Sequence, residues 1–105
     1  MKVELYYFDG CPNYNSAISN LKSALQERDI SSKIEIIRVK SPEHAQELNF
    51  QGSPSIVIDG IDLERKDDPA LFGCRIYEID GKLTGNPTRQ FIGDKLDELI
   101  KSNST

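Results

Sequence analysis

The sequence predicts a single α/β domain, and two observations lead to this class, while a third concerns its partners. Segments rich in branched and aromatic residues alternate with segments whose apolar residues recur at helical spacing. A chain of 105 residues is long enough for one core and too short for a second. Acidic and basic residues are interspersed, and the formal charge of −4 provides no basic surface for nucleic acid.

The first half of the chain predicts two strands and two helices. Residues 2 to 8 are apolar and aromatic and predict a strand that ends at Asp9-Gly10. Residues 12 to about 28 predict an amphipathic helix, whose apolar face is formed by Ala17, Ile18, Leu21, Ala24 and Leu25. Residues 33 to 39 predict a second strand that should be largely buried. Ser41-Pro42-Glu43 predicts the start of a short helix that runs to about Phe50.

The second half predicts two strands and one helix. Residues 55 to 59 form the third strand, which is closed by Asp59-Gly60. Residues 61 to 73 have no clear period and include a charged run, so they predict a solvated loop. Residues 75 to 79 predict the fourth strand, and Asp80-Gly81 predicts a turn directly after it. Asn86-Pro87 caps a last helix with one apolar stripe of Phe91, Ile92, Leu96, Leu99 and Ile100.

The predicted order is therefore β-α-β-α-β-β-α over residues 1–105. Strands separated by a helix should be parallel neighbours, and the last two strands should pair antiparallel. The result is a central four-stranded mixed sheet with helices on both faces.

Cys11 is the residue with the clearest chemical potential. It follows the first strand at the start of the first helix, where we expect it to be the N-cap. Unpaired backbone N–H groups and the helix dipole there favour a thiolate over a thiol. Cys11 is therefore a candidate nucleophile, although cysteine also caps helices without any chemical role.

The residues around Cys11 and Pro54 resemble a known family. The order of elements, Cys11-Pro12 between the first strand and first helix, and Gly52-Ser53-Pro54 before the third strand resemble the thioredoxin-like superfamily at glutaredoxin size. The resemblance covers essentially the whole chain. It implies that Pro54 is cis and lies beside Cys11, and that the backbone of Ser53 is free to pair with a substrate. Without the resemblance, Pro54 is a strand-initiating proline.

The chain departs from the dithiol motif of that family. The second cysteine would stand at position 14, which is tyrosine, so the motif Cys-Pro-Asn-Tyr has a single thiol. Tyr14 either offers its hydroxyl to the thiolate or packs as an aromatic residue. The chemistry predicted is monothiol exchange by Cys11 with a thiol or disulfide substrate, which includes protein substrates, resolved by an external thiol. Cys74 is a candidate resolving thiol or a small buried residue, and the topology predicts that it lies away from Cys11.

Glutathione is a candidate ligand, and no other cofactor is expected. Asn86 and Thr88, before the last helix, could meet its carboxylate. Asp9 stands where glutaredoxins commonly have a lysine, and its carboxylate repels both glutathione and a thiolate. An oxyanion reductase of the same superfamily is a weaker alternative, because the first helix has no arginine before Arg28.

Other classes are constrained by composition. Two distant cysteines and a single histidine predict no structural metal site, and the N-terminal apolar stretch is too short and too charged for a signal peptide or membrane span. The sequence predicts a cytoplasmic location. The alternative from another class is a non-catalytic thioredoxin-like module that binds a protein or captures a soft metal or an electrophile through its thiol.

Overall fold

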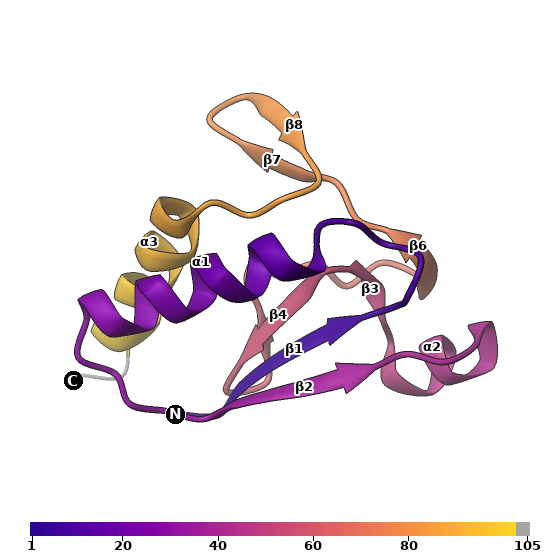
Figure 1. The fold of residues 1–105 in the computed structure, drawn as a ribbon, viewed down its shortest axis with the longest axis horizontal. Coiled ribbons are helices and arrows are strands. Elements are labelled where there is room, and N and C mark those ends of the chain that lie inside the picture. Colours follow the sequence, from indigo (N-terminus) through magenta and orange to yellow (C-terminus); the bar gives the residue numbers. More distant parts are fainter. Residues whose placement is uncertain (103–105) are drawn as a thin grey trace.

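The computed structural model describes residues 1–102 (Figure 1). In chain order, the elements are β1 (Val3–Tyr7), α1 (Tyr14–Glu27), β2 (Ile34–Arg38), α2 (Pro42–Leu48), β3 (Gln51–Ser53), β4 (Ser55–Ile58), β5 (Ile61–Asp62), β6 (Leu71–Cys74), β7 (Tyr77–Ile79), β8 (Lys82–Thr84) and α3 (Arg89–Ser102). Within the described residues, this is a mixed α/β architecture with three helices and a four-stranded mixed sheet.

The main sheet has the order β2-β1-β4-β5. β1 pairs with β2 in parallel and with β4 antiparallel. The prediction that every strand separated by a helix runs parallel is therefore wrong for β4. The physical reason is the length of α2: its seven residues rise about 10 Å, too little to return along a strand of five residues that extends about 17 Å. β4 therefore starts where β1 and β2 end, and runs back beside β1.

Two Asp-Gly turns make hairpins that the predicted topology lacks. Asp59-Gly60 joins β4 to β5, and Asp80-Gly81 joins β7 to β8. All four residues have positive φ, between 51° and 81°, as a two-residue type I′ hairpin requires. On the side away from β1, the antiparallel partner of β4 is therefore β5, not residues 75–79, and β7 and β8 form a separate two-stranded sheet.

The predicted loop of residues 61–73 also ends in a strand. β6 pairs in parallel with β3, with Gln51 opposite Leu71 and Ser53 opposite Cys74. Backbone hydrogen bonds from Leu71 N–H to the Phe50 carbonyl and from Arg75 N–H to the Ser53 carbonyl fix both ends of this pairing. The long connection thus folds back over the end of the main sheet.

The core lies between the main sheet and the paired helices α1 and α3. The inward residues of β1 and β4 meet the predicted apolar faces of both helices, and the fully buried members include Val3, Leu5, Leu21, Ile56, Ile58, Ile92 and Leu96. A second, smaller cluster lies at the other face, where Ala45 of α2 packs with Val39, Phe50, Tyr6 and Phe8. The prediction of a largely buried second strand is wrong, because β2 is an edge strand and the middle of it is exposed.

The helix ends differ from two of the three predictions. Ser41 caps α2 by accepting a hydrogen bond from His44 N–H, with Pro42 in the first turn, as predicted. α1 begins at Tyr14 with Asn13 as its N-cap, so Cys11 lies two residues before the cap. For α3, Thr88 accepts a hydrogen bond from Phe91 N–H and is the capping residue in place of Asn86.

Candidate functional site

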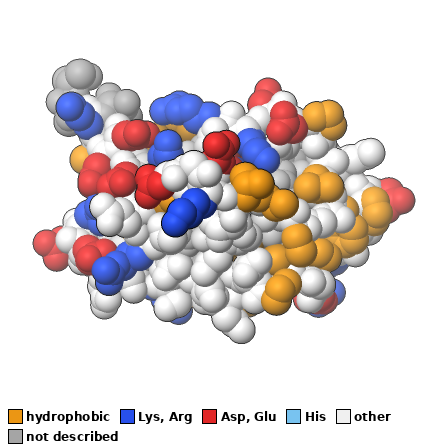
Figure 2. All heavy atoms as spheres, turned by 90° about the horizontal axis from the view of Figure 1, so that it is seen from above, with side chains coloured by type: hydrophobic (Ala, Val, Ile, Leu, Met, Phe, Trp, Pro, Cys, Tyr) orange, Lys and Arg blue, Asp and Glu red, His pale blue; other side chains and the backbone are white. Residues whose placement is uncertain are grey.

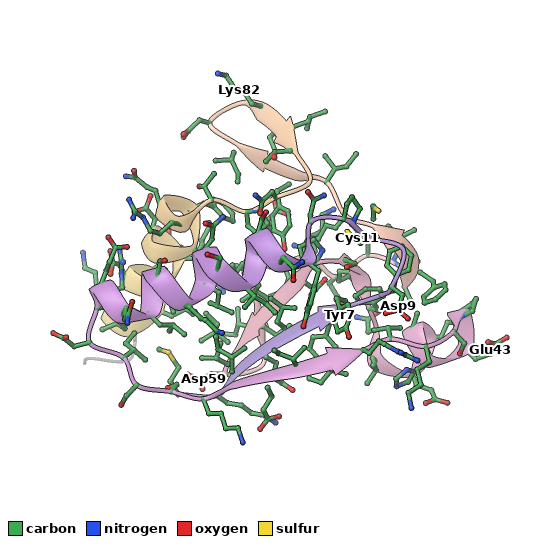
Figure 3. The ribbon with its side chains drawn as sticks, in the orientation of Figure 1. Tyr7, Asp9, Cys11, Glu43, Asp59 and Lys82 are labelled. Atoms are coloured by element: carbon green, nitrogen blue, oxygen red, sulfur yellow. The ribbon has the colours of Figure 1, made fainter. Side chains whose placement is uncertain are left out.

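Cys11 lies in the turn that connects β1 to α1, above the end of the main sheet (Figure 3). Its N–H donates to the Phe8 carbonyl oxygen at 3.2 Å, which closes the turn. The residue is 7% exposed, while the following Pro12 is exposed. The dipole argument for Cys11 is weaker than the sequence suggested, because the field of a helix falls off within the first turn and Cys11 precedes the cap.

The Ser53–Pro54 peptide bond is cis, as the resemblance implied, and it lies next to Cys11. The Cys11 thiol donates a hydrogen bond to the Ser53 carbonyl oxygen at 3.2 Å. That carbonyl also accepts from Arg75 N–H at 2.9 Å, and Ser53 Oγ accepts from Phe8 N–H at 3.3 Å. Ser53 is fully buried and its carbonyl is already paired, so the expectation that this carbonyl is free for a substrate is wrong; it holds Cys11 and the residue that follows β6.

Cys74 lies beside Cys11, contrary to the predicted topology. β6 sets Cys74 opposite Ser53, whose carbonyl already binds the Cys11 thiol. The pKa of the Cys74 thiol is raised, first by desolvation, then by its hydrogen bond to Cys11 and by the charge of Cys11. Both thiols are free, and Cys74 is exposed, so the interpretation of Cys74 as a small buried residue is wrong.

The position of β6 depends on Arg75, the residue after Cys74. Its guanidinium is fully buried and binds both carboxylate oxygens of Asp62 at 2.6 and 2.7 Å, and Glu64 at 3.0 Å. Burial alone would lower the pKa of Arg75, but the hydrogen bonds to these carboxylates and their charges raise it overall. The guanidinium therefore stays charged inside the protein, and it fixes the chain immediately after Cys74.

Two further groups join this ion network to the cis proline. Arg75 donates to Ser55 Oγ at 3.1 Å and lies over the Tyr77 ring, 4.4 Å from its centroid. The Tyr77 hydroxyl donates to the Pro54 carbonyl, and burial raises the pKa of that hydroxyl. Sequence reasoning missed this network. It assigned Glu64 to a solvated loop, and nothing local in the sequence distinguishes Glu64 from its exposed neighbours.

Tyr14 packs as an aromatic residue at the start of α1. Its ring stacks on Tyr7, with centroids 4.0 Å apart and an interplanar angle of 27°. Desolvation is the main cause of the raised pKa of Tyr14. The stacking joins the end of β1 to the first turn of α1, and so supports the turn that carries Cys11.

Asn86 and Thr88 lie in the segment that leads into α3. Gly85 closely approaches the Asn13 side chain, so this segment reaches the turn between β1 and α1. Asn86 N–H donates to Thr84 Oγ1 at 3.2 Å, and Thr88 is occupied as the cap of α3. On the other side of the turn, Asp9 forms an exposed ion pair with Arg38 at 3.3 Å, which offsets the carboxylate charge expected there.

Comparison of the chain with protein-family models, with curated proteins and with solved structures gives no match. Among residues 1–102, no group of three or more histidine, cysteine, aspartate or glutamate side chains is arranged to hold a metal ion. No helix in the same range combines the length and apolar character needed to cross a membrane.

Proposed function

We propose that this chain is a thiol–disulfide exchange protein with a thioredoxin-like fold, in which Cys11 and Cys74 are the redox pair. The observation that carries the proposal is the position of the two thiols beside the cis Ser53–Pro54 bond: Cys74 lies opposite Ser53, whose carbonyl accepts a hydrogen bond from the Cys11 thiol. The sheet order β2-β1-β4-β5, with one parallel and two antiparallel pairings, supports the fold assignment. Cys74 thus takes the resolving role that a motif cysteine at position 14 would have had.

The exchange proceeds in two steps. The Cys11 thiolate attacks one sulfur of a substrate disulfide; a bond forms between that sulfur and Cys11 Sγ, the substrate S–S bond breaks, and the departing thiolate takes a proton from water. Cys74 then gives its proton to water and attacks Cys11 Sγ. This step releases the remaining substrate thiol and leaves a Cys11–Cys74 disulfide, so the substrate is reduced and the protein oxidised. Two equivalents of an external thiol, with glutathione as one candidate, then restore both cysteines: the first forms a mixed disulfide and the second displaces it, so the external thiol leaves as its own disulfide.

The residues around the two cysteines favour Cys11 as the attacking thiol and Cys74 as the resolving thiol. Desolvation, then the hydrogen bond to Cys11 and the charge of Cys11, raise the pKa of the Cys74 thiol, which suits Cys74 to react second. The Ser53 carbonyl and the Phe8 carbonyl hold Cys11 through its thiol and its N–H. The buried Arg75 network fixes Cys74 from the following residue. Both sulfurs are therefore held in place before a substrate arrives, which reduces the ordering cost of the second step.

A single-turnover experiment with hydroxyethyl disulfide tests this proposal. The reduced protein is mixed with the disulfide, quenched with acid, and analysed by mass spectrometry. We expect the unmodified protein to end as an internal Cys11–Cys74 disulfide, and Cys74→Ser to stop at a mixed disulfide on Cys11. Cys11→Ser should form neither species at a comparable rate. A Cys74→Ser protein that releases its adduct as fast as the unmodified protein would show that Cys74 does not resolve it.

The burial of Cys11 supports a second candidate, a non-catalytic thioredoxin-like binding module. Cys11 is 7% exposed and its thiol is hydrogen-bonded to the Ser53 carbonyl. Buried cysteines of this kind also occur as unreactive structural residues. The same experiment separates the two functions. If neither cysteine of the reduced protein reacts with hydroxyethyl disulfide, the exchange proposal fails and the binding module remains.

A further inference from the structure

β6 is an edge strand with one side open. It pairs with β3 alone, and no described strand lies along its outer edge. An unpaired strand edge offers backbone N–H and C=O groups to another extended chain. The Phe72 ring also contacts the Phe8 ring, with centroids 5.2 Å apart, so this edge adjoins the turn that carries Cys11.

The outer surface of this strand is apolar. Leu71 is 49% exposed, Phe72 36% and, just after the strand, Ile76 58%. The only charged residue in positions 71–76 is Arg75, whose side chain is fully buried. Figure 2 shows hydrophobic side chains gathered at the end of the molecule where Figure 1 places β6. Exposed edge strands are usually protected by charges or proline, so an unprotected apolar one indicates a binding surface.

Cys74 brings the thiol pair to this surface. Cys74 is the last residue of β6 and is exposed, whereas Cys11 behind it is largely buried. A chain that pairs with the outer edge of β6 would therefore pass its own side chains across Cys74. This arrangement suits a substrate whose sulfur is part of an extended segment.

We infer that the substrate is a polypeptide: an extended, apolar, cysteine-containing segment that adds as a strand to the outer edge of β6. This inference rests on the proposed function. Charge complementarity selects the partner: the net charge of −4, with Asp67 and Asp68 exposed between Arg65-Lys66 and β6, favours basic residues flanking the apolar segment. A second copy of this chain would bring these aspartates and a net charge of −4 together at the same edge, which disfavours self-pairing.

Two mixed disulfides of thionitrobenzoate provide the test, since release of the coloured thiol measures the exchange rate. One carries the peptide Lys-Val-Leu-Cys-Val-Leu-Lys and the other carries glutathione, which is anionic. We expect the second-order rate constant of the reduced protein for the peptide to exceed that for glutathione by about tenfold or more. The double variant Leu71→Gln/Ile76→Gln should lower this ratio by about tenfold, the effect of losing two partly buried apolar contacts. Leu83→Gln is the matched control, because Leu83 is 75% exposed on β8, away from β6, and should leave the ratio unchanged.

A peptide with methylated backbone nitrogens separates strand pairing from apolar contact alone. We expect it to lose most of the advantage over glutathione, because methylation removes the donors that pair with the strand. Equal rates for the plain peptide, the methylated peptide and glutathione would overturn the inference while leaving the exchange activity intact. No exchange with any of them would overturn the proposed function itself. Sedimentation of a dimer that the double variant dissociates would assign the edge to a second copy instead.

Discussion

Replacing Gly52 with alanine should push β6 away from β3 and separate the two cysteines. Gly52 has φ +94°, a conformation that side-chain-bearing residues rarely adopt. An added Cβ would lie 2.9 Å from Arg75 Cβ, 3.1 Å from Arg75 Cα and 3.2 Å from Arg75 N. Two of these atoms belong to the backbone, so a side-chain rotation cannot relieve the contact. The strand that carries Cys74 has to move.

A matched control isolates the steric part of the effect. Gly81 has φ +77° in the turn between β7 and β8, and a Cβ there would meet nothing within 4 Å. Gly81→Ala should therefore lower the free energy of unfolding by the backbone cost alone, about 1–2 kcal/mol. Gly52→Ala carries a similar backbone cost and an overpacking cost of about 1–3 kcal/mol, so we expect a total loss of about 2–5 kcal/mol.

Urea unfolding at neutral pH measures both losses. A second readout is the rate at which diamide, a small thiol oxidant, converts the reduced protein to the internal disulfide, followed by mass spectrometry. We expect this rate to fall in Gly52→Ala and to stay unchanged in Gly81→Ala. If the two variants lose equal stability and form the disulfide at equal rates, the close approach at Gly52 does not set the spacing of the cysteines.

Three further predictions follow from the network around the site. Cys11→Ala should lower the pKa of Cys74 toward its ordinary value, because it removes a hydrogen bond and a charge that raise it; the pH dependence of alkylation by iodoacetamide measures the change. Arg75→Met should lower the free energy of unfolding by about 3–5 kcal/mol, since it leaves two largely buried carboxylates unpaired, and an equal value for variant and parent in urea would contradict the buried network. Burial raises the pKa of Tyr77, so the contribution of Tyr77 to the free energy of unfolding is complete below about pH 10 and is lost at higher pH. Tyr77→Phe should lower the free energy of unfolding by about 1–3 kcal/mol at neutral pH, because the Pro54 carbonyl loses its donor. Urea unfolding across pH should show that the variant loses less stability than the parent above about pH 10.

Short-range patterns along the chain are enough to predict most of the helices and strands of this protein. The apolar stripes of α1 and α3, the branched run of β1 and the Ser41-Pro42 start of α2 are short-range patterns, and the structure confirms each of them. Asp59-Gly60 and Asp80-Gly81 are equally local patterns. An Asp-Gly pair is typical of a two-residue hairpin turn, so these two pairs also indicate the hairpins that contain β5 and β8. The placement of Cys11 beside Pro54 was implied by the resemblance, and it depends on β4 running antiparallel to β1, which the sequence did not predict.

The directions and partners of these strands depend on long-range contacts that no local pattern predicts. The direction of β4 depends on α2 being too short to cross the sheet, and the position of Cys74 depends on a long connection folding back onto β3. That fold-back is held by Arg75 with Asp62 and Glu64, 13 and 11 residues away. Charged residues of this kind are exposed in most loops, and their burial follows from mutual pairing in three dimensions, which spacing along the chain does not encode.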